Sequence, residues 1–281
     1  MRIKKYPNGN SYLLTPNGKW VRDFTAKGVP LLDINDTVKP EDNFLFINNE
    51  FENNIKRYAW IDTEKFYFPN VVIISDGFGF ENGHRIISKI KNIENVTVIG
   101  VNGSLKKWAC EKNMSFYLVN NPYEESVADL PKRRMLPRCI ASCRTNFNFL
   151  SNYKGTVFRY NPVNEKTYGG KGSKEATWSV DDYRNPICAA IGIAYKFGVE
   201  KLLLMHCDES FEQERPGSVL LENGLWTYPQ QIVAQELIDA NMFWLQSNDY
   251  SDVKVGNFSK GIKYQFAAYI DNEEDVINFF N

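Results

Sequence analysis

The sequence lacks the features that identify membrane, secreted and zinc-binding proteins. No apolar run reaches the roughly 18 residues that cross a bilayer, and the opening MRIKKYPNGN has charges with no apolar stretch after them, unlike a secretion signal. The 5 cysteines are odd in number and irregularly spaced, and only 2 histidines are present. We therefore expect a cytoplasmic protein with reduced thiols, no membrane span and no metal site.

The sequence also has no excess of charge of one sign. Its 33 Lys and Arg residues nearly balance its 34 Asp and Glu residues, which gives a net charge of −1. This balance gives no support to nucleic-acid binding or to a membrane-surface role. We expect no nucleic-acid partner, and the sequence leaves the formation of a homo-oligomer open.

Three apolar segments each run directly into a short polar or glycine-rich turn. They read VVIISDGFGF (Val71–Phe80), VTVIGVNGSL (Val96–Leu105) and KLLLMHCDES (Lys201–Ser210). Apolar runs without polar alternation are typical of strands that are buried on both faces. They predict an α/β fold, a Rossmann-like and mostly parallel sheet with helices on both faces. In such sheets ligands bind beyond the carboxyl ends of the strands.

The sequence pattern divides the chain into two expected parts. Residues 1–68 are expected to form a β-rich N-terminal extension, in which two Pro-Asn-Gly triplets flank SYLLT and predict an antiparallel meander. Residues 69–281 are expected to form the Rossmann-like domain. Further expected strands are Asn43–Asn49, Lys65–Asn70, Phe116–Asn121, Thr156–Tyr160 and Lys263–Ile270, and expected helices cover about 82–92, 104–112, 186–197 and 228–246, with a short acidic helix at the end.

The turn after the first strand carries three glycines, Gly77, Gly79 and Gly83, before a helix. Glycines there let a backbone approach a phosphate at the helix start. The spacing G-x-G-x-x-x-G departs from the dinucleotide fingerprint, and Asp76 and Glu81 would repel a phosphate unless a cation intervened. We interpret the loop as lying next to a ligand, and the alternative is a tight turn with no ligand.

The turns after the other two strands hold further candidates. Asn102 could contact a base or a sugar edge, whereas Ser104 most simply caps the following helix. In HCDES, Asp208 could hold a cation or orient a sugar hydroxyl, and His206 could act as a general base. The alternative is that Asp208 caps a turn and His206 is a satisfied buried histidine. Cys207 faces away from His206 on a strand, which argues against a Cys-His dyad.

A polar, glycine-bearing segment at Asn161–Asp182 is typical of a lid. Its Tyr168 and Lys171 could close over a phosphate-bearing substrate. The alternative is an ordinary solvated surface loop.

This order of motifs resembles the superfamily that joins bacterial sialyltransferases, Maf-type flagellin glycosyltransferases and MptE-like pterin pyrophosphokinases. The resemblance covers roughly Val71–Phe211 and is closest over Asn185–Phe211, a small-residue helix that feeds an apolar strand ending near Asp. LVNNPYEE (Leu118–Glu125) looks like the sialyltransferase stretch that ends in Asn-Pro. The first loop of the families usually reads G-x-G-P-S-L, where this chain has SDGFGFENG, and the Asp-Leu-Asp-Gly loop of the pyrophosphokinases is absent.

The resemblance implies a nucleotide-dependent transferase, favoured as a glycosyltransferase whose donor substrate is a nucleotide sugar. The residues that would contact the donor are Gly77, Gly79, Asn102, Ser104, Asn121, Tyr168 and Lys171. Asp208, or in second place His206, would act on the acceptor hydroxyl as the catalytic group. Two alternatives stay open: a non-catalytic binding or assembly protein on the same fold, and a metal-dependent pyrophosphokinase acting on a small heterocycle.

Overall fold

A computed structural model of residues 1–281 gives the architecture. It describes residues 3–5, 11–14, 20–23, 54, 57–61, 66–108, 114–120, 136–162, 179–180, 185–208, 210–248 and 252–281. The predicted strand at 43–49, most of the predicted lid with Tyr168 and Lys171, and Asn121 lie outside the described residues.

The central sheet confirms the predicted α/β class. It has 10 strands in the order β10-β9-β8-β7-β6-β5-β11-β14-β15, with β4 also pairing with β9, and every pair is parallel. Its strands are β4 (Ala59–Trp60), β5 (Asn70–Ile74), β6 (Thr97–Val101), β7 (Phe116–Val119), β8 (Arg138–Ser142), β9 (Val157–Pro162), β10 (Ser179–Val180), β11 (Lys201–Met205), β14 (Lys254–Phe258) and β15 (Ala268–Tyr269).

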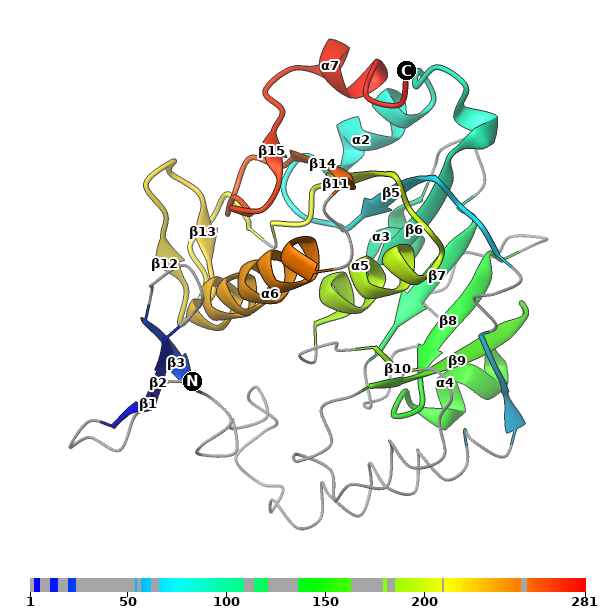
Figure 1. The fold of residues 1–281 in the computed structure, drawn as a ribbon, viewed down its shortest axis with the longest axis horizontal. Helices are drawn as coiled ribbons and strands as arrows, with labels where there is room; N and C mark the ends of the chain where they lie inside the picture. Colours follow the sequence, from blue (N-terminus) through cyan, green and yellow to red (C-terminus); the bar gives the residue numbers. More distant parts are fainter. Residues whose placement is uncertain are drawn as a thin grey trace.

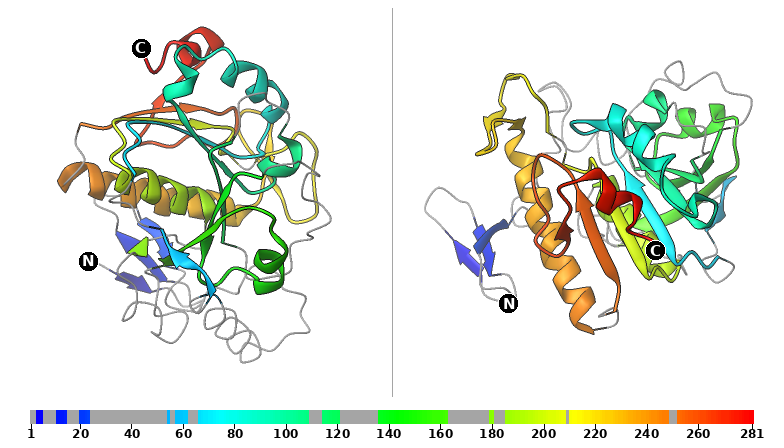
Figure 2. Two further views of the ribbon diagram at one scale, coloured as in Figure 1. Left: turned by 90° about the vertical axis from the view of Figure 1, so that its right-hand side faces the viewer. Right: turned by 90° about the horizontal axis from the view of Figure 1, so that it is seen from above.

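Helices cover both faces of this sheet (Figures 1 and 2). On one face lie α5 (Pro186–Lys196) and α6 (Pro229–Asn248), and the other carries α2 (Phe80–Ile87), α3 (Ser104–Lys107), α4 (Phe147–Asn152) and α7 (Glu273–Ile277), with a 3₁₀ turn at Ile93–Asn95. Within β5, Val71 and Ile73 enter the first core, and Val72 and Ile74 enter the second. Because successive side chains of a strand point to opposite faces, a strand between two cores must be apolar throughout.

Local capping residues bound the crossover helix α5. Asn185 caps the helix, since its Oδ1 accepts hydrogen bonds from the backbone N–H groups of Ile187 and Cys188 at 2.7 and 3.3 Å. Pro186 occupies the first turn, and Gly198 follows the helix with φ +74°, the left-handed conformation typical of a C-terminal cap. This short connection delivers the chain to β11.

The order of the strands reverses next to β5. From β5 the chain proceeds through β6, β7, β8 and β9 to β10 on one side, and then returns to place β11, β14 and β15 on the other side. The topological switch point therefore lies between the carboxyl ends of β5 and β11, and this is where open α/β sheets bind ligands.

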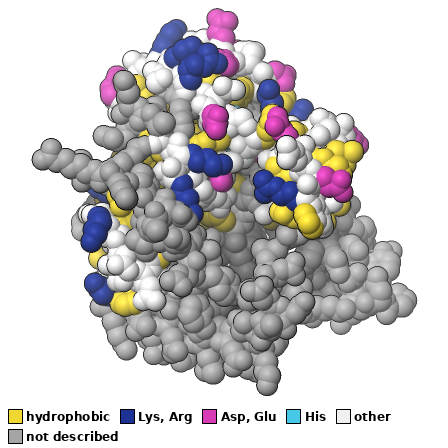
Figure 3. All heavy atoms as spheres, turned by 180° about the vertical axis from the view of Figure 1, so that it is seen from behind, with side chains coloured by type: hydrophobic (Ala, Val, Ile, Leu, Met, Phe, Trp, Pro, Cys, Tyr) yellow, Lys and Arg dark blue, Asp and Glu magenta, His cyan; other side chains and the backbone are white. Residues whose placement is uncertain are grey.

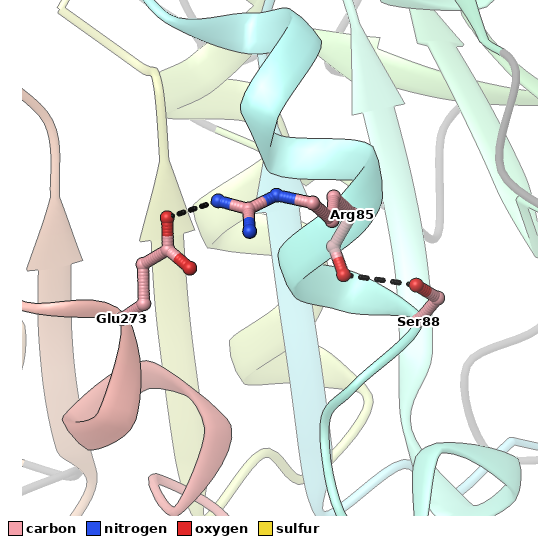
Figure 4. A network of polar contacts seen from close by, with 3 residues as sticks. All are labelled: Arg85, Ser88 and Glu273. Carbon is pink, nitrogen blue, oxygen red and sulfur yellow. Dashed lines mark hydrogen bonds and ion pairs between the residues drawn. The ribbon is translucent and has the colours of Figure 1, made fainter.

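Three smaller features surround the sheet. The predicted antiparallel meander is present as β1 (Ile3–Lys5), β2 (Ser11–Leu14) and β3 (Trp20–Asp23), and a hairpin is formed by β12 (Val219–Leu220) and β13 (Trp226–Thr227). An ion pair of 2.5 Å between Arg85 and Glu273 joins α2 to α7 (Figure 4). Both side chains are largely exposed, so this ion pair adds little stability.

Several predicted elements differ from the structure. Residues 66–68 form no strand, because Phe66 and Phe68 pack among the aromatic rings around Phe197. The helix expected at 82–92 ends at Ile87, and α3 is a single turn after which Trp108 is extended. The strand expected over Lys263–Ile270 is reduced to Ala268–Tyr269, and the sequence did not predict β4 or β14. The division of the chain at residue 68 stays a prediction.

The surface charge agrees with the balanced composition of the sequence (Figure 3). Figure 3 shows basic and acidic side chains interspersed over the described part of the rear face. Among the described helices, none combines the length and the apolar character needed to cross a bilayer.

Candidate functional site

The turn that follows β11, His206–Asp208, is called the β11 turn below. It makes hydrogen bonds to β14 and to the loop after β5, the elements on either side of β11. The backbone N–H of His206 donates to Phe258 O at 3.0 Å, and the carbonyl of His206 accepts from Gly77 N at 3.1 Å. His206 itself has φ +51°, a left-handed conformation that a non-glycine residue rarely adopts. The β11 turn is thus tied to both β14 and the loop after β5.

The glycines of the loop after β5 give room to this turn. A Cβ at Gly83 would lie 2.9 Å from the Cδ2 and Nε2 atoms of His206, and a Cβ at Gly79 would lie 3.3 Å from Cε1. At Gly77 a Cβ would collide with the carbonyl oxygen of His206 and with Oδ1 of Asp208. These three glycines are therefore explained by close packing against the β11 turn.

His206 is buried and bonded on the α2 side of the sheet. Its Nδ1 lies 2.8 Å from Phe78 O, and because a carbonyl can only accept, Nδ1 carries the proton. Its ring packs edge-on against Phe258. This contact satisfies Nδ1, whereas the alternative of a fully satisfied histidine and the role of His206 as a base both stay predictions.

Asp208 is a buried carboxylate, 2% exposed. Its Oδ2 accepts from Gly261 N at 2.5 Å and its Oδ1 accepts from Ser210 N at 3.4 Å. Burial raises the pKa of Asp208 above its ordinary value of 3.8, and the amide hydrogen bonds oppose this shift only in part. Asp208 therefore binds a proton more strongly than a surface aspartate does. This property suits a general base that accepts a proton from a hydroxyl group.

Cys207 points away from His206, as the sequence predicted. Its side chain belongs to the core beneath α5, its thiol lies 3.6 Å from Ile73 O, and its carbonyl accepts from the hydroxyl of Tyr264 at 2.9 Å. The side chain of His206 therefore lies on the α2 face of the sheet, and that of Cys207 lies on the α5 face.

The second part of the site lies at the ends of β5 and β6. Asn102 has φ +52°, and its Nδ2 donates to Ser75 Oγ at 3.0 Å. Asp76 lies over Gly103, its side chain is 31% exposed, and Lys107 approaches it at 3.7 Å. Ser75, Asp76 and Asn102 thus form one polar group beside the switch point.

Ser104 does not cap its helix, which corrects the prediction. The cap position is taken by Gly103, and no side chain caps this helix. The hydroxyl of Ser104 is fully buried against Gly100, where a Cβ would lie 2.7 Å from it. Its predicted contact with a donor stays a prediction.

Two polar positions that the sequence analysis missed also lie at the carboxyl edge. Asn120 directly follows β7, and Arg144, only 7% exposed, follows β8. Thr145 next to it donates from its hydroxyl to Val119 O at 3.0 Å. The sequence at 138–142 fits a strand or a helix, so it gives no reason to place Arg144 at a strand end. Within the described residues, no group of three or more His, Cys, Asp or Glu side chains could hold a metal ion.

Comparison with solved structures gives a likeness of fold. No family model matches the chain, and no curated protein matches it by sequence. Its fold is similar to that of a Maf glycosyltransferase from Magnetospirillum magneticum AMB-1, with a TM-score of 0.60 and 13% identity over 88% of this chain and 40% of the other. The chain thus spans about two fifths of that protein, and the likeness confirms a distant glycosyltransferase-like fold.

The contact between His206 and Gly83 predicts a measurable coupling. In the interior of a helix, Gly→Ala normally stabilises by roughly 1 kcal/mol. Here Gly83→Ala should instead lower the free energy of unfolding, by about 1–2 kcal/mol, because the new methyl meets the imidazole. In a His206→Ala background the same change should be neutral or stabilising, as urea unfolding of the four proteins would reveal.

Gly192→Ala is the matched control for this cycle. Gly192 lies in α5 and its Cβ would meet Val180, far along the chain from His206. Its effect should be the same in both backgrounds. If Gly83→Ala has the same effect in both backgrounds, the imidazole of His206 is not the reason why position 83 requires glycine.

Proposed function

We propose that the protein is a nucleotide-dependent transferase, specifically a glycosyltransferase that uses a nucleotide-sugar donor. The observation that carries the proposal is the polar group of Ser75, Asp76 and Asn102 at the carboxyl ends of β5 and β6, beside the switch point. The fold likeness to a glycosyltransferase supports the transferase class.

Charge decides which part of the donor lies over this group. Asp76 is partly exposed, and the carboxylate of Asp208 lies against Gly77. Two carboxylates disfavour a phosphate at the glycine loop, so the uncharged nucleoside lies over Asn102 and the backbone of Gly77 and Gly79. The phosphate then extends toward the cation of Lys107 and toward Lys171 and the hydroxyl of Tyr168, two predicted donor contacts that lie outside the described residues.

The reaction needs one base and stabilisation of one leaving group. A hydroxyl oxygen of the acceptor attacks the anomeric carbon of the donor, its proton passes to the carboxylate of Asp208, and the bond from that carbon to the phosphate oxygen breaks. The electron pair leaves with the nucleotide, whose growing charge Lys171 or Tyr168 stabilises. A base with a raised pKa is well suited to the proton transfer.

The donor site is tested by Asn102→Gly. Because Asn102 is left-handed, glycine removes the side chain without straining the backbone. The variant should keep its fold and lose about tenfold or more in affinity for a nucleotide sugar, measured as the concentration dependence of the thermal shift.

The control is Asn92→Gly, because Asn92 has φ 57° and lies just before β6, away from the carboxyl edge. It should bind as the unmodified protein does. No thermal shift with any nucleotide or nucleotide sugar, with or without a divalent cation, would refute the donor site.

A non-catalytic binding protein is the second candidate, and one observation favours it. The loop glycines face His206 and Asp208, and Asp208 already accepts two backbone hydrogen bonds. These residues could therefore serve the fold alone. On this reading the protein binds a ligand or partner without turnover.

Asp208→Asn separates the two candidates, with Asp239→Asn as its matched control. Asp239 is also buried and holds the same loop, since it accepts from the N–H groups of Gln265 and Phe266 at 2.7 and 3.4 Å. If Asp208 is the base, Asp208→Asn should lower turnover by roughly 100-fold or more while donor binding persists, and Asp239→Asn should have a much smaller effect.

Turnover of the unmodified enzyme should also fall at acid pH. Burial raises the pKa of Asp208, so the ionised base is lost at a higher pH than for an exposed aspartate. Equal losses in the two variants, or no release of nucleotide from any nucleotide sugar by the unmodified protein, would favour the binding protein.

A further inference from the structure

A small pocket lies on the α5 and α6 side of the β11 turn, apart from the donor residues. Asn185, Asp208, Gln231, Gln235, Ile262 and Tyr264 line it. Its empty volume is about 210 Å³, part of it open to solvent. The enclosed part has room for about one water-sized group, so the pocket suits only the tip of a ligand whose remainder lies in solvent.

Some side-chain groups that line this pocket are not fully engaged in hydrogen bonds with the described part of the protein. Asn185 uses Oδ1 to cap α5, and its Nδ2 makes no hydrogen bond within the described part of the chain. The side chain of Gln231, in the first turn of α6, likewise makes none with any described residue. Asp208 Oδ1 accepts a long hydrogen bond of 3.4 Å from Ser210 N. Two amide side chains and a carboxylate therefore line the same pocket.

The electrostatics of the pocket disfavour ions of both signs. The N-termini of α5 and α6 reach it through Asn185 and Gln231, and each helix end carries roughly half a positive charge, which disfavours a cation. The buried carboxylate of Asp208 disfavours an anion. Neither Lys nor Arg is among the residues that line the pocket. The group that fits is uncharged, and it both donates and accepts hydrogen bonds.

We infer that this pocket binds a neutral hydroxyl-bearing group, such as the hydroxymethyl end of a sugar or polyol. The hydroxyl donates to Asp208 Oδ1 and accepts from the amides of Asn185 and Gln231, while its carbon lies against Ile262 and the ring of Tyr264. The pocket shares Asp208 with the proposed base. Resting on the proposed function, it is the site of the acceptor, whose reactive hydroxyl it presents to that carboxylate.

Saturation-transfer NMR tests this inference with glucose and two charged derivatives: glucosamine, which has an ammonium group at C2, and glucuronate, which has a carboxylate in place of the hydroxymethyl group. Glucose should bind, with glucosamine as its ammonium form and glucuronate binding at least fivefold more weakly. Asn185→Asp keeps the helix cap but loses the donor, and Gln231→Leu removes an amide at similar size. Each variant should weaken glucose binding about five- to tenfold, the effect of one lost hydrogen bond.

Asn146→Asp is the matched control, because Asn146 caps α4 through its Oδ1 in the same way and does not line the pocket. It should leave glucose binding unchanged. The inference is overturned if glucose does not bind, if a charged hexose binds more tightly, or if neither pocket variant weakens binding.

A thermal-shift titration with nucleotide sugars on the same samples distinguishes this failure from failure of the proposed function. Donor binding without glucose binding would overturn the pocket alone. Glucose binding that both pocket variants weaken, without donor binding, would uphold the pocket and remove its assignment to an acceptor.

Discussion

The packing of the β11 turn against the loop after β5 is the constraint on which the site depends. The carbonyl and imidazole of His206 and the carboxylate of Asp208 fill the space where Gly77, Gly79 and Gly83 would carry side chains. This contact closes the gap between the two strands at the switch point. It also fixes the positions of Ser75 and Asn102 on one side and of the pocket beneath α6 on the other.

The same contact determines the electrostatics of the crevice. A carboxylate from β11 lies against the glycine loop, and Asp76 extends from the loop itself, so the backbone there is poorly suited to a phosphate. Glycines at this position in a Rossmann-like sheet usually indicate an anion. Here their small size admits protein atoms instead. Polar but largely uncharged ligand groups are therefore the ones that suit both sides of the β11 turn.

Continuous apolar runs were sufficient to predict β5, β6 and β11, because a strand between two cores can carry no polar alternation. The range of α5 was also predictable locally, since the expected 186–197 is close to the observed Pro186–Lys196. By contrast, β14 reads KVGNF, and its Gly256 and Asn257 are residues that strands disfavour, so the sequence does not predict it. Its pairing with β11 and β15 defines it as a strand. The glycine loop was recognised, but its packing partner was not, since the contact of Gly83 with His206 depends on strand order.

The central claim is that ligands bind at the switch point between β5 and β11. Backbone amide chemical shifts during titration with a nucleotide sugar test it most directly. The account predicts saturable shifts at Ser75–Gly77, Asn102–Ser104 and the β11 turn, with Asn92 at the opposite edge unaffected. Saturable shifts that cluster elsewhere and spare these three turns would contradict it.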